Sequence, residues 1–161
     1  MVRASPDRSL LMAVNETYIS APPEKVFDVL SDPESYGYWV VGSKEIRDAD
    51  RGWPAPGARF HHSVGYGPLT LGDDTVCERS ERPNLIELRA RARPLGTAIV
   101  RLDLRPEDRG TRVRMREDPG DALSAFVFTP LMHLLVRRRN SESLRRLAAL
   151  AERRGAPARD S

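Results

Sequence analysis

The stretch "ISAPPEKVFDVLSDPESYGYWV", residues 19–40, decides the fold of this chain. Its β-type run ends at Pro22. A residue that precedes a proline is kept out of the α region, so Pro22 stays extended and Pro23 can begin a helix. The apolar face of that helix is formed by Val26, Phe27, Val29 and Leu30. Asp32 and Pro33 repeat the same pattern, which predicts a second short helix over "PESYGYW".

Both helices are shorter than the roughly 12–15 residues at which an isolated helix becomes marginal, so they must pack against something larger. A strand is expected before them, over Leu10–Ser20, and about six strands after them. One of these strands has a clear period of two, with Ala98, Val100, Leu102 and Leu104 on the apolar face. Short turns join the strands, which indicates an antiparallel meander.

The last apolar pattern, residues 121–155, predicts one long C-terminal helix. Asp121 is its expected N-cap, Gly155 its expected end, and Pro130 an interior kink. The apolar stripes before and after Pro130 differ in direction by roughly 80° on an ideal helix. A curved antiparallel sheet that grips this helix would bury its apolar face, which makes the fold class α+β.

Composition restricts the function classes. The 161 residues, 40% hydrophobic and 30% charged, suit one globular domain. The 26 basic and 23 acidic residues leave a net charge of +3, so no nucleic-acid partner is expected. A lone Cys77 excludes an intrachain disulfide and suits a reducing compartment. The N-terminus lacks a signal-peptide core, and the longest apolar run falls short of the roughly 20 residues needed to span a bilayer. A cytoplasmic protein without stable membrane insertion is expected.

Four further segments accompany the opening stretch: "PGARF", "VCERSERPNLIELRA", "GTRVRMRE" and "LRRLAALAE". Over residues 11–154 the chain resembles the START-like superfamily, also called the polyketide cyclase/dehydrase, Bet v 1-like or SRPBCC group. The resemblance implies a helix-grip fold, in which a seven-stranded curved antiparallel sheet surrounds a long C-terminal helix and two short helices join strands one and two. It also implies an apolar cavity for lipids, polyketides or other hydrophobic small molecules. The domain is expected over 10–155, with flexible tails at 1–9 and 156–161.

The pair His61–His62 is the main candidate for chemistry. Neighbouring side chains on a strand point to opposite faces, and the apolar company of Phe60, Val64 and Tyr66 assigns His62 to the interior. His62 is then either a polar anchor or general base in the cavity, or a hydrogen-bonded interior histidine. No zinc spacing, phosphate loop, dinucleotide fingerprint or nucleophile elbow occurs, so no metal and no cofactor is expected.

Aromatic and aliphatic side chains at inward positions are the expected ligand contacts. Trp39 either lines the cavity entrance or plugs the core, and His133 either meets His62 or lies on the helix surface. The alternating arginines of 89–93 and 112–116 are expected on solvated outer faces; turned inward, they would make the pocket cationic. The full set of expected contacts is Tyr36, Trp39, Trp53, Phe60, His62, Val64, Tyr66, Val100, Leu102, Met115, Phe126, Phe128, Pro130, Leu131 and Leu134.

Three functions stay open. The first is binding or transport of a hydrophobic or amphipathic, lipid-like or polyketide-like molecule. The alternative is a polyketide aromatase/cyclase-type enzyme, in which His62 and Tyr66 are the candidate catalytic residues for proton transfer. The third is a protein contact through the basic C-terminal helix or a sheet edge, and the chain is expected to be a monomer or homodimer.

Overall fold

An antiparallel sheet of seven strands carries the fold, in the order β1-β7-β6-β5-β4-β3-β2. The computed structural model describes residues 12–66, 69–91, 96–127 and 129–156. Consecutive strands from β2 to β7 pair as neighbours, and β7 pairs with β1, so the predicted meander and the seven-stranded sheet are confirmed. The strands are β1 (Ala13–Ile19), β2 (Ser43–Ala49), β3 (Arg59–Tyr66), β4 (Leu69–Glu81), β5 (Leu85–Arg91), β6 (Thr97–Glu107) and β7 (Gly110–Pro119).

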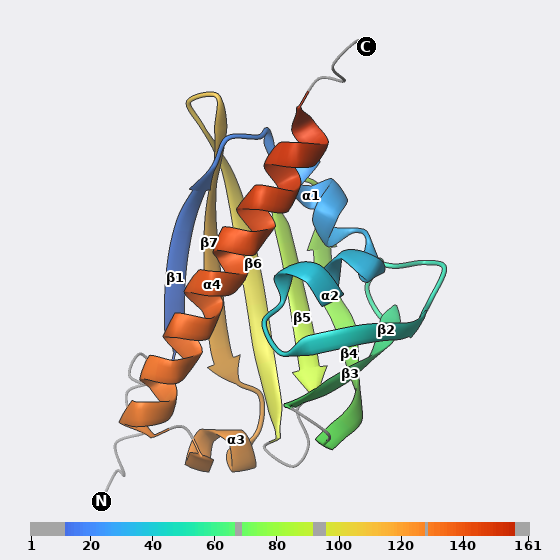
Figure 1. Ribbon diagram of the computed structural model, residues 1–161, viewed down its shortest axis with the longest axis vertical. Coiled ribbons are helices and arrows are strands. Elements are labelled where there is room, and N and C mark those ends of the chain that lie inside the picture. The colour runs from blue at the N-terminus through green and yellow to red at the C-terminus, as the bar shows by residue number, and fades with distance from the viewer. Residues whose placement is uncertain (1–11, 67–68, 92–95, 128, 157–161) are drawn as a thin grey trace, which may run out of the picture.

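The helices cover one face of this sheet. The long helix α4 crosses the sheet diagonally, with α1 beside its C-terminal half and α2 beside its middle (Figure 1). The short helix α3 lies at the end of the sheet where β7 finishes (Figure 1). The helical segments are α1 (Pro23–Leu30), the 3₁₀ turn η2 (Pro33–Ser35), α2 (Tyr36–Trp39), α3 (Ala122–Val127) and α4 (Pro130–Gly155). The predicted helix-grip arrangement is therefore confirmed.

The two short helices form where the prolines predict them. Pro22 is extended, with a ψ of 156°, and Pro23 occupies the first turn of α1. The Asp32 side chain accepts a hydrogen bond from the Glu34 amide at 3.1 Å and caps the next turn. The apolar face of α1 is buried against the core, which supplies the packing that an eight-residue helix needs.

The predicted continuous helix with a kink at Pro130 is wrong. The chain forms α3, leaves the helical conformation, and begins α4 at Pro130. Thr129 caps α4 by accepting a hydrogen bond from the Met132 amide at 3.3 Å. Proline fits the first turn because the amide hydrogen that it lacks has no partner within the helix there. Asp121 does act as a cap, but for α3: its carboxylate accepts from the Ser124 amide at 2.8 Å.

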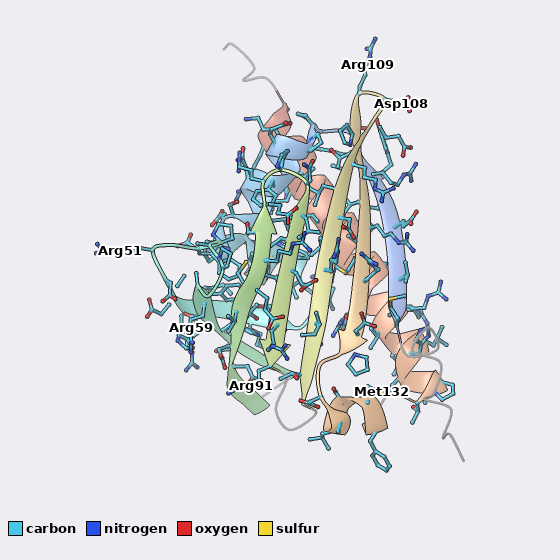
Figure 2. All side chains as sticks on the ribbon, turned by 180° about the vertical axis from the view of Figure 1, so that it is seen from behind. Arg51, Arg59, Arg91, Asp108, Arg109 and Met132 are labelled. Atoms are coloured by element: carbon cyan, nitrogen blue, oxygen red, sulfur yellow. The ribbon has the colours of Figure 1, made fainter. Side chains whose placement is uncertain are left out.

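The packed core joins the C-terminal half of α4 to the sheet. Leu144 and Leu147 are fully buried together with Leu102, Leu104 and other inward-facing strand residues. The side chains on the opposite face of the sheet include many arginines paired with acids, as predicted for an outer face. The pairs are Arg89–Glu78, Arg101–Asp103, Arg114–Glu16 and Arg116–Asp103. Figure 2 shows this outer face, with Asp108 and Arg109 at the tip of the β6–β7 hairpin and Arg91 at the other end of the sheet.

The predicted tail at 1–9 lies outside the described residues, and so does the predicted tail at 156–161 except for its first residue. Within the described ranges, no helix is both long enough and apolar enough to cross a bilayer.

Candidate ligand-binding site

A cavity of about 170 Å³ lies between the inner face of the sheet, the middle of α4, and the segment that runs from α2 into β2. Strands β3 to β7 supply one wall, and α4 supplies the opposite one. Most of the strand side chains in the wall are apolar. The lining residues are Tyr36, Trp39, Val40, Val41, Gly42, Ser43, Phe60, His62, Thr75, Leu88, Ala90, Arg91, Ala98, Val100, Met115, Glu117, Arg139, Asn140 and Ser143.

Aromatic rings close one end of the cavity. The ring of Tyr36 lies 5.0 Å from that of Trp39 and 4.8 Å from that of Phe60, measured between centroids. Trp53 packs behind them, 4.7 Å from Phe60, and does not line the cavity. The Tyr36 hydroxyl and the Trp53 indole both donate to the Leu30 carbonyl, at 2.9 and 3.2 Å. Because that carbonyl belongs to the last turn of α1, these bonds also satisfy a helix end.

The Tyr36 side chain links α2 to the end of α1 and does not act as an acid or base. Burial, helped by the nearby Cys77 and Asp32, raises the pKa of its hydroxyl well above the usual value. The hydroxyl therefore stays protonated and keeps donating to Leu30. Cys77 is equally inert: burial raises the pKa of its thiol to about 11, and the thiol donates to the Pro54 carbonyl at 3.1 Å.

His62 enters the cavity and His61 faces outward, as the strand alternation predicts. His62 is 8% exposed, and its ring lies 5.6 Å from that of Phe60. Burial lowers the pKa of His62 below its ordinary value, although the negative charges of Asp73 and Asp74 oppose the shift. The imidazole is consequently neutral at pH 7, so it can both donate and accept a hydrogen bond.

A polar network forms the helix side of the wall. The Glu117 carboxylate, 5% exposed, accepts hydrogen bonds from the Arg139 guanidinium and from the Asn140 amide, the latter at 2.8 Å. The Asn140 oxygen in turn accepts from Arg139 at 3.0 Å. Next to this network, the Ser143 hydroxyl accepts from the Val41 amide at 3.1 Å and ties α4 to the segment before β2.

Sequence reasoning missed these polar residues, although the sequence holds a signal for them. Glu117 continues the inward series Val113, Met115 on β7. Asn140 and Ser143 lie on the same buried stripe of α4 as Leu147. A polar residue at an inward position of an otherwise apolar pattern marks the interior of a cavity or a buried network.

Six of the predicted contacts meet in the cavity: Tyr36, Trp39, Phe60, His62, Val100 and Met115. Leu102 is fully buried in the packed core and does not reach it. The side chains of Val64, Tyr66 and Phe128 lie outside the described part of the structure. Four others are exposed around α3 and the first turns of α4, at the end of the sheet away from α2: Phe126, Pro130, Leu131 and Leu134.

The structure does not bring these four residues to the cavity, because the break at Thr129 places the first turns of α4 at the end of the sheet beside α3 (Figure 1). His133 does not meet His62 either; its Nε2 lies 3.1 Å from the Met12 carbonyl oxygen. Among the described residues, no group of three histidine, cysteine or acidic side chains is placed to hold a metal ion.

Comparison with solved structures identifies the same fold in other proteins. Protein MLL2253 from Mesorhizobium loti shares 21% of its sequence and superimposes with a TM-score of 0.67, covering 88% of this chain and 97% of its own. The allergen Ara h 8.0201 is 13% identical, with a TM-score of 0.67 and coverages of 87% and 96%. The di-domain aromatase/cyclase BexL of the BE-7585A biosynthetic pathway is 15% identical, with a TM-score of 0.66; the match covers 93% of this chain and 52% of BexL. At these identities the likeness concerns the fold alone.

No curated protein matches the chain in sequence. A family described as "Polyketide cyclase / dehydrase and lipid transport" matches residues 13–152, which is most of the chain and all of the helix-grip elements except the end of α4. The chain therefore belongs to the polyketide cyclase/dehydrase and lipid transport family, within the START-like superfamily that its sequence resembles.

Proposed function

We propose that this protein binds one hydrophobic or amphipathic small molecule in the cavity between the sheet and α4. The observation that carries the proposal is the lining: Phe60, Leu88, Val100 and Met115 provide apolar contact, while a few polar groups stand among them. A concave, mostly apolar site with a small number of polar groups is typical of small-molecule binding. The family description, which includes both lipid transport and cyclase chemistry, supports binding of a hydrophobic small molecule.

A substitution that places a larger side chain in the cavity tests whether the ligand binds there. Ala98 lines the cavity on β6, and its neighbour Ile99 points to the other face of the sheet. Native mass spectrometry of the purified protein, followed by extraction and identification of any bound molecule, would show a one-to-one complex in the wild type. Ala98→Leu should lose that complex, because the added side chain occupies ligand space. The matched control Ile99→Leu should keep it; equal retention by both variants would place the ligand elsewhere.

A cyclase-type enzyme is the second candidate, and the environment of His62 favours it. A neutral histidine in an apolar cavity is available to accept a proton from an acidic carbon of a bound poly-ketone. General-base catalysis typically contributes about 10²–10⁴-fold to a rate. Tyr66 remains a predicted partner for this step. With a synthetic poly-ketone thioester, His62→Gln should slow cyclisation by at least that lower factor, and an unchanged rate would rule out this role for His62.

A further inference from the structure

The volume of the cavity restricts what can enter it. Sites for drug-sized ligands usually occupy about 300–1,000 Å³, whereas an engineered apolar cavity of about 150 Å³ in another protein holds one benzene molecule. The cavity here measures about 170 Å³. This volume is the size of a single substituted ring, and several fused rings or a long acyl chain would extend beyond it.

The polar groups in the wall divide into two sets. On the α4 side, Glu117, Arg139 and Asn140 bond to one another. On the side of α2, β2 and β3, Nε1 of Trp39, the Ser43 hydroxyl and Nδ1 of His62 are buried without a hydrogen-bond partner among the described residues. Buried polar atoms in proteins nearly always have a partner, so an unpaired one calls for a group that the protein itself does not supply.

Two of these atoms, the Ser43 hydroxyl and Nδ1 of His62, belong to neighbouring strands. Ser43 begins β2, and His62 lies on β3 opposite Ile46 of β2. Both residues line the cavity, and a turn of Ser43 about χ1 or of the imidazole about χ2 would be needed to present the unpaired atom to a bound molecule. A hydroxyl can donate or accept, and a neutral imidazole does one at each nitrogen. Together they suit an oxygen that both accepts and donates, as a phenolic hydroxyl does.

The charged side chains around the cavity also favour a hydroxyl-bearing ligand. The positive charge of Arg139 is paired with Glu117, and that of Arg91 lies 3.6 Å from an oxygen of Asp74. Neither arginine is left as an unpaired cation to bind an anion in the cavity. A neutral ligand oxygen is therefore favoured over a carboxylate or phosphate.

We propose that the ligand is a neutral single-ring molecule bearing a hydroxyl, with the ring among Phe60, Leu88, Val100 and Met115 and the oxygen bonded to Ser43 and His62. This inference rests on the proposed binding function and names its ligand class. A chain or fused-ring ligand would extend beyond the cavity between the sheet and α4.

The experiment uses two matched probes, 4-ethylphenol and ethylbenzene, which differ by one hydroxyl. Calorimetric titration should show 4-ethylphenol binding more tightly, by about three- to tenfold for each of its two hydrogen bonds. In His62→Leu this preference should fall by one such factor, because the Ser43 contact remains, while ethylbenzene still binds. Equal affinities in the wild type would overturn the hydroxyl contact.

Two further measurements test the placement of the ligand and distinguish an error in the ligand class from an error in the proposed function. In ¹⁵N-edited spectra of the wild type, which need no variant to fold, either probe should shift the indole N–H of Trp39 in the cavity wall more than that of Trp53 behind it. A larger shift at Trp53 would overturn the placement. Oleate and 1-anthrol test size: if they bind and 4-ethylphenol does not, the single-ring class is wrong but the proposed function stands. If none of the four compounds binds, the proposed ligand class is wrong. If, in addition, native mass spectrometry shows no complex, the proposed binding function is wrong as well.

Discussion

Removing Arg139 tests the polar network that joins α4 to β7 at the cavity. Arg139→Met deletes the guanidinium and keeps most of the aliphatic stem. The Glu117 carboxylate, 5% exposed, would then keep only the Asn140 amide as a hydrogen-bond donor from the network. Asn140 would also lose the donor to its own side-chain oxygen. The substitution thus leaves a buried charge under-satisfied.

The expected magnitude follows from the exposure of the partners. Removing one partner of a fully buried ion pair costs about 3–5 kcal/mol, and a hydrogen bond to a charged group contributes about 1.5–3 kcal/mol. The Arg139 side chain is 38% exposed, so water replaces part of the lost interaction. We expect a loss of about 1–2 kcal/mol in the free energy of unfolding, measured by urea denaturation at pH 7 with an unchanged m-value.

A double-mutant cycle supplies the control. Glu117→Gln removes the buried charge, so adding Arg139→Met to it should cost less than in the wild type, with a coupling of about 1 kcal/mol. Arg145→Met removes an arginine of the same helix whose partner, Glu142, is on the surface, and it should shift the urea midpoint far less. Additive effects in the cycle, or equal shifts for Arg139→Met and Arg145→Met, would refute the assignment of a buried network.

Three further predictions concern the helix and His62. Leu147→Ala should cost about 2–5 kcal/mol in urea denaturation because Leu147 is fully buried, and a loss below 1 kcal/mol would contradict its core position. Thr129→Ala should cost about 1 kcal/mol through the lost cap of α4, whereas Thr129→Ser should not. Because the pKa of His62 is lowered in the folded state, the unfolded chain binds the proton more readily, and stability should fall as the pH drops below about 6.5. His62→Gln should flatten this slope and His61→Gln should retain it; an unchanged slope in His62→Gln would refute the assignment.

The sequence predicts most of the fold because its strongest signals are local. The double proline at 22–23 keeps Pro22 extended and suits Pro23 to the first turn of a helix, and the structure has both. The alternation on β6 predicts the buried pair Leu102 and Leu104 because a strand has a period of two. Each of these signals depends on a few adjacent residues, and packing against the rest of the molecule only reinforces it.

The break before α4 was not predicted because the apolar pattern on both sides of Pro130 is compatible with a kink as well as with a new helix. The missed signal is the order Thr129–Pro130, a capping residue followed by a proline, which is typical of a helix start. The difference matters for the site. A continuous helix would have brought Phe126 toward the sheet, whereas Phe126 is 87% exposed.

The cavity exists because the inward-facing side chains in one half of the space between helix and sheet are small or polar. Along the inner face, Leu144 and Leu147 of α4 meet large strand residues and fill one half of the space between helix and sheet. In the other half, Asn140 and Ser143 take the helix positions, and Ala90 faces Ala98 across β5 and β6. The small side chains leave a volume that no neighbouring residue fills. The polar side chains of the helix form hydrogen bonds there, Asn140 with Glu117 and Ser143 with the Val41 amide, in place of apolar packing. One half of the helix-grip is thus a packed core that holds α4 in place, and the other half is open to a ligand because its inward positions lack the side chains that would fill it.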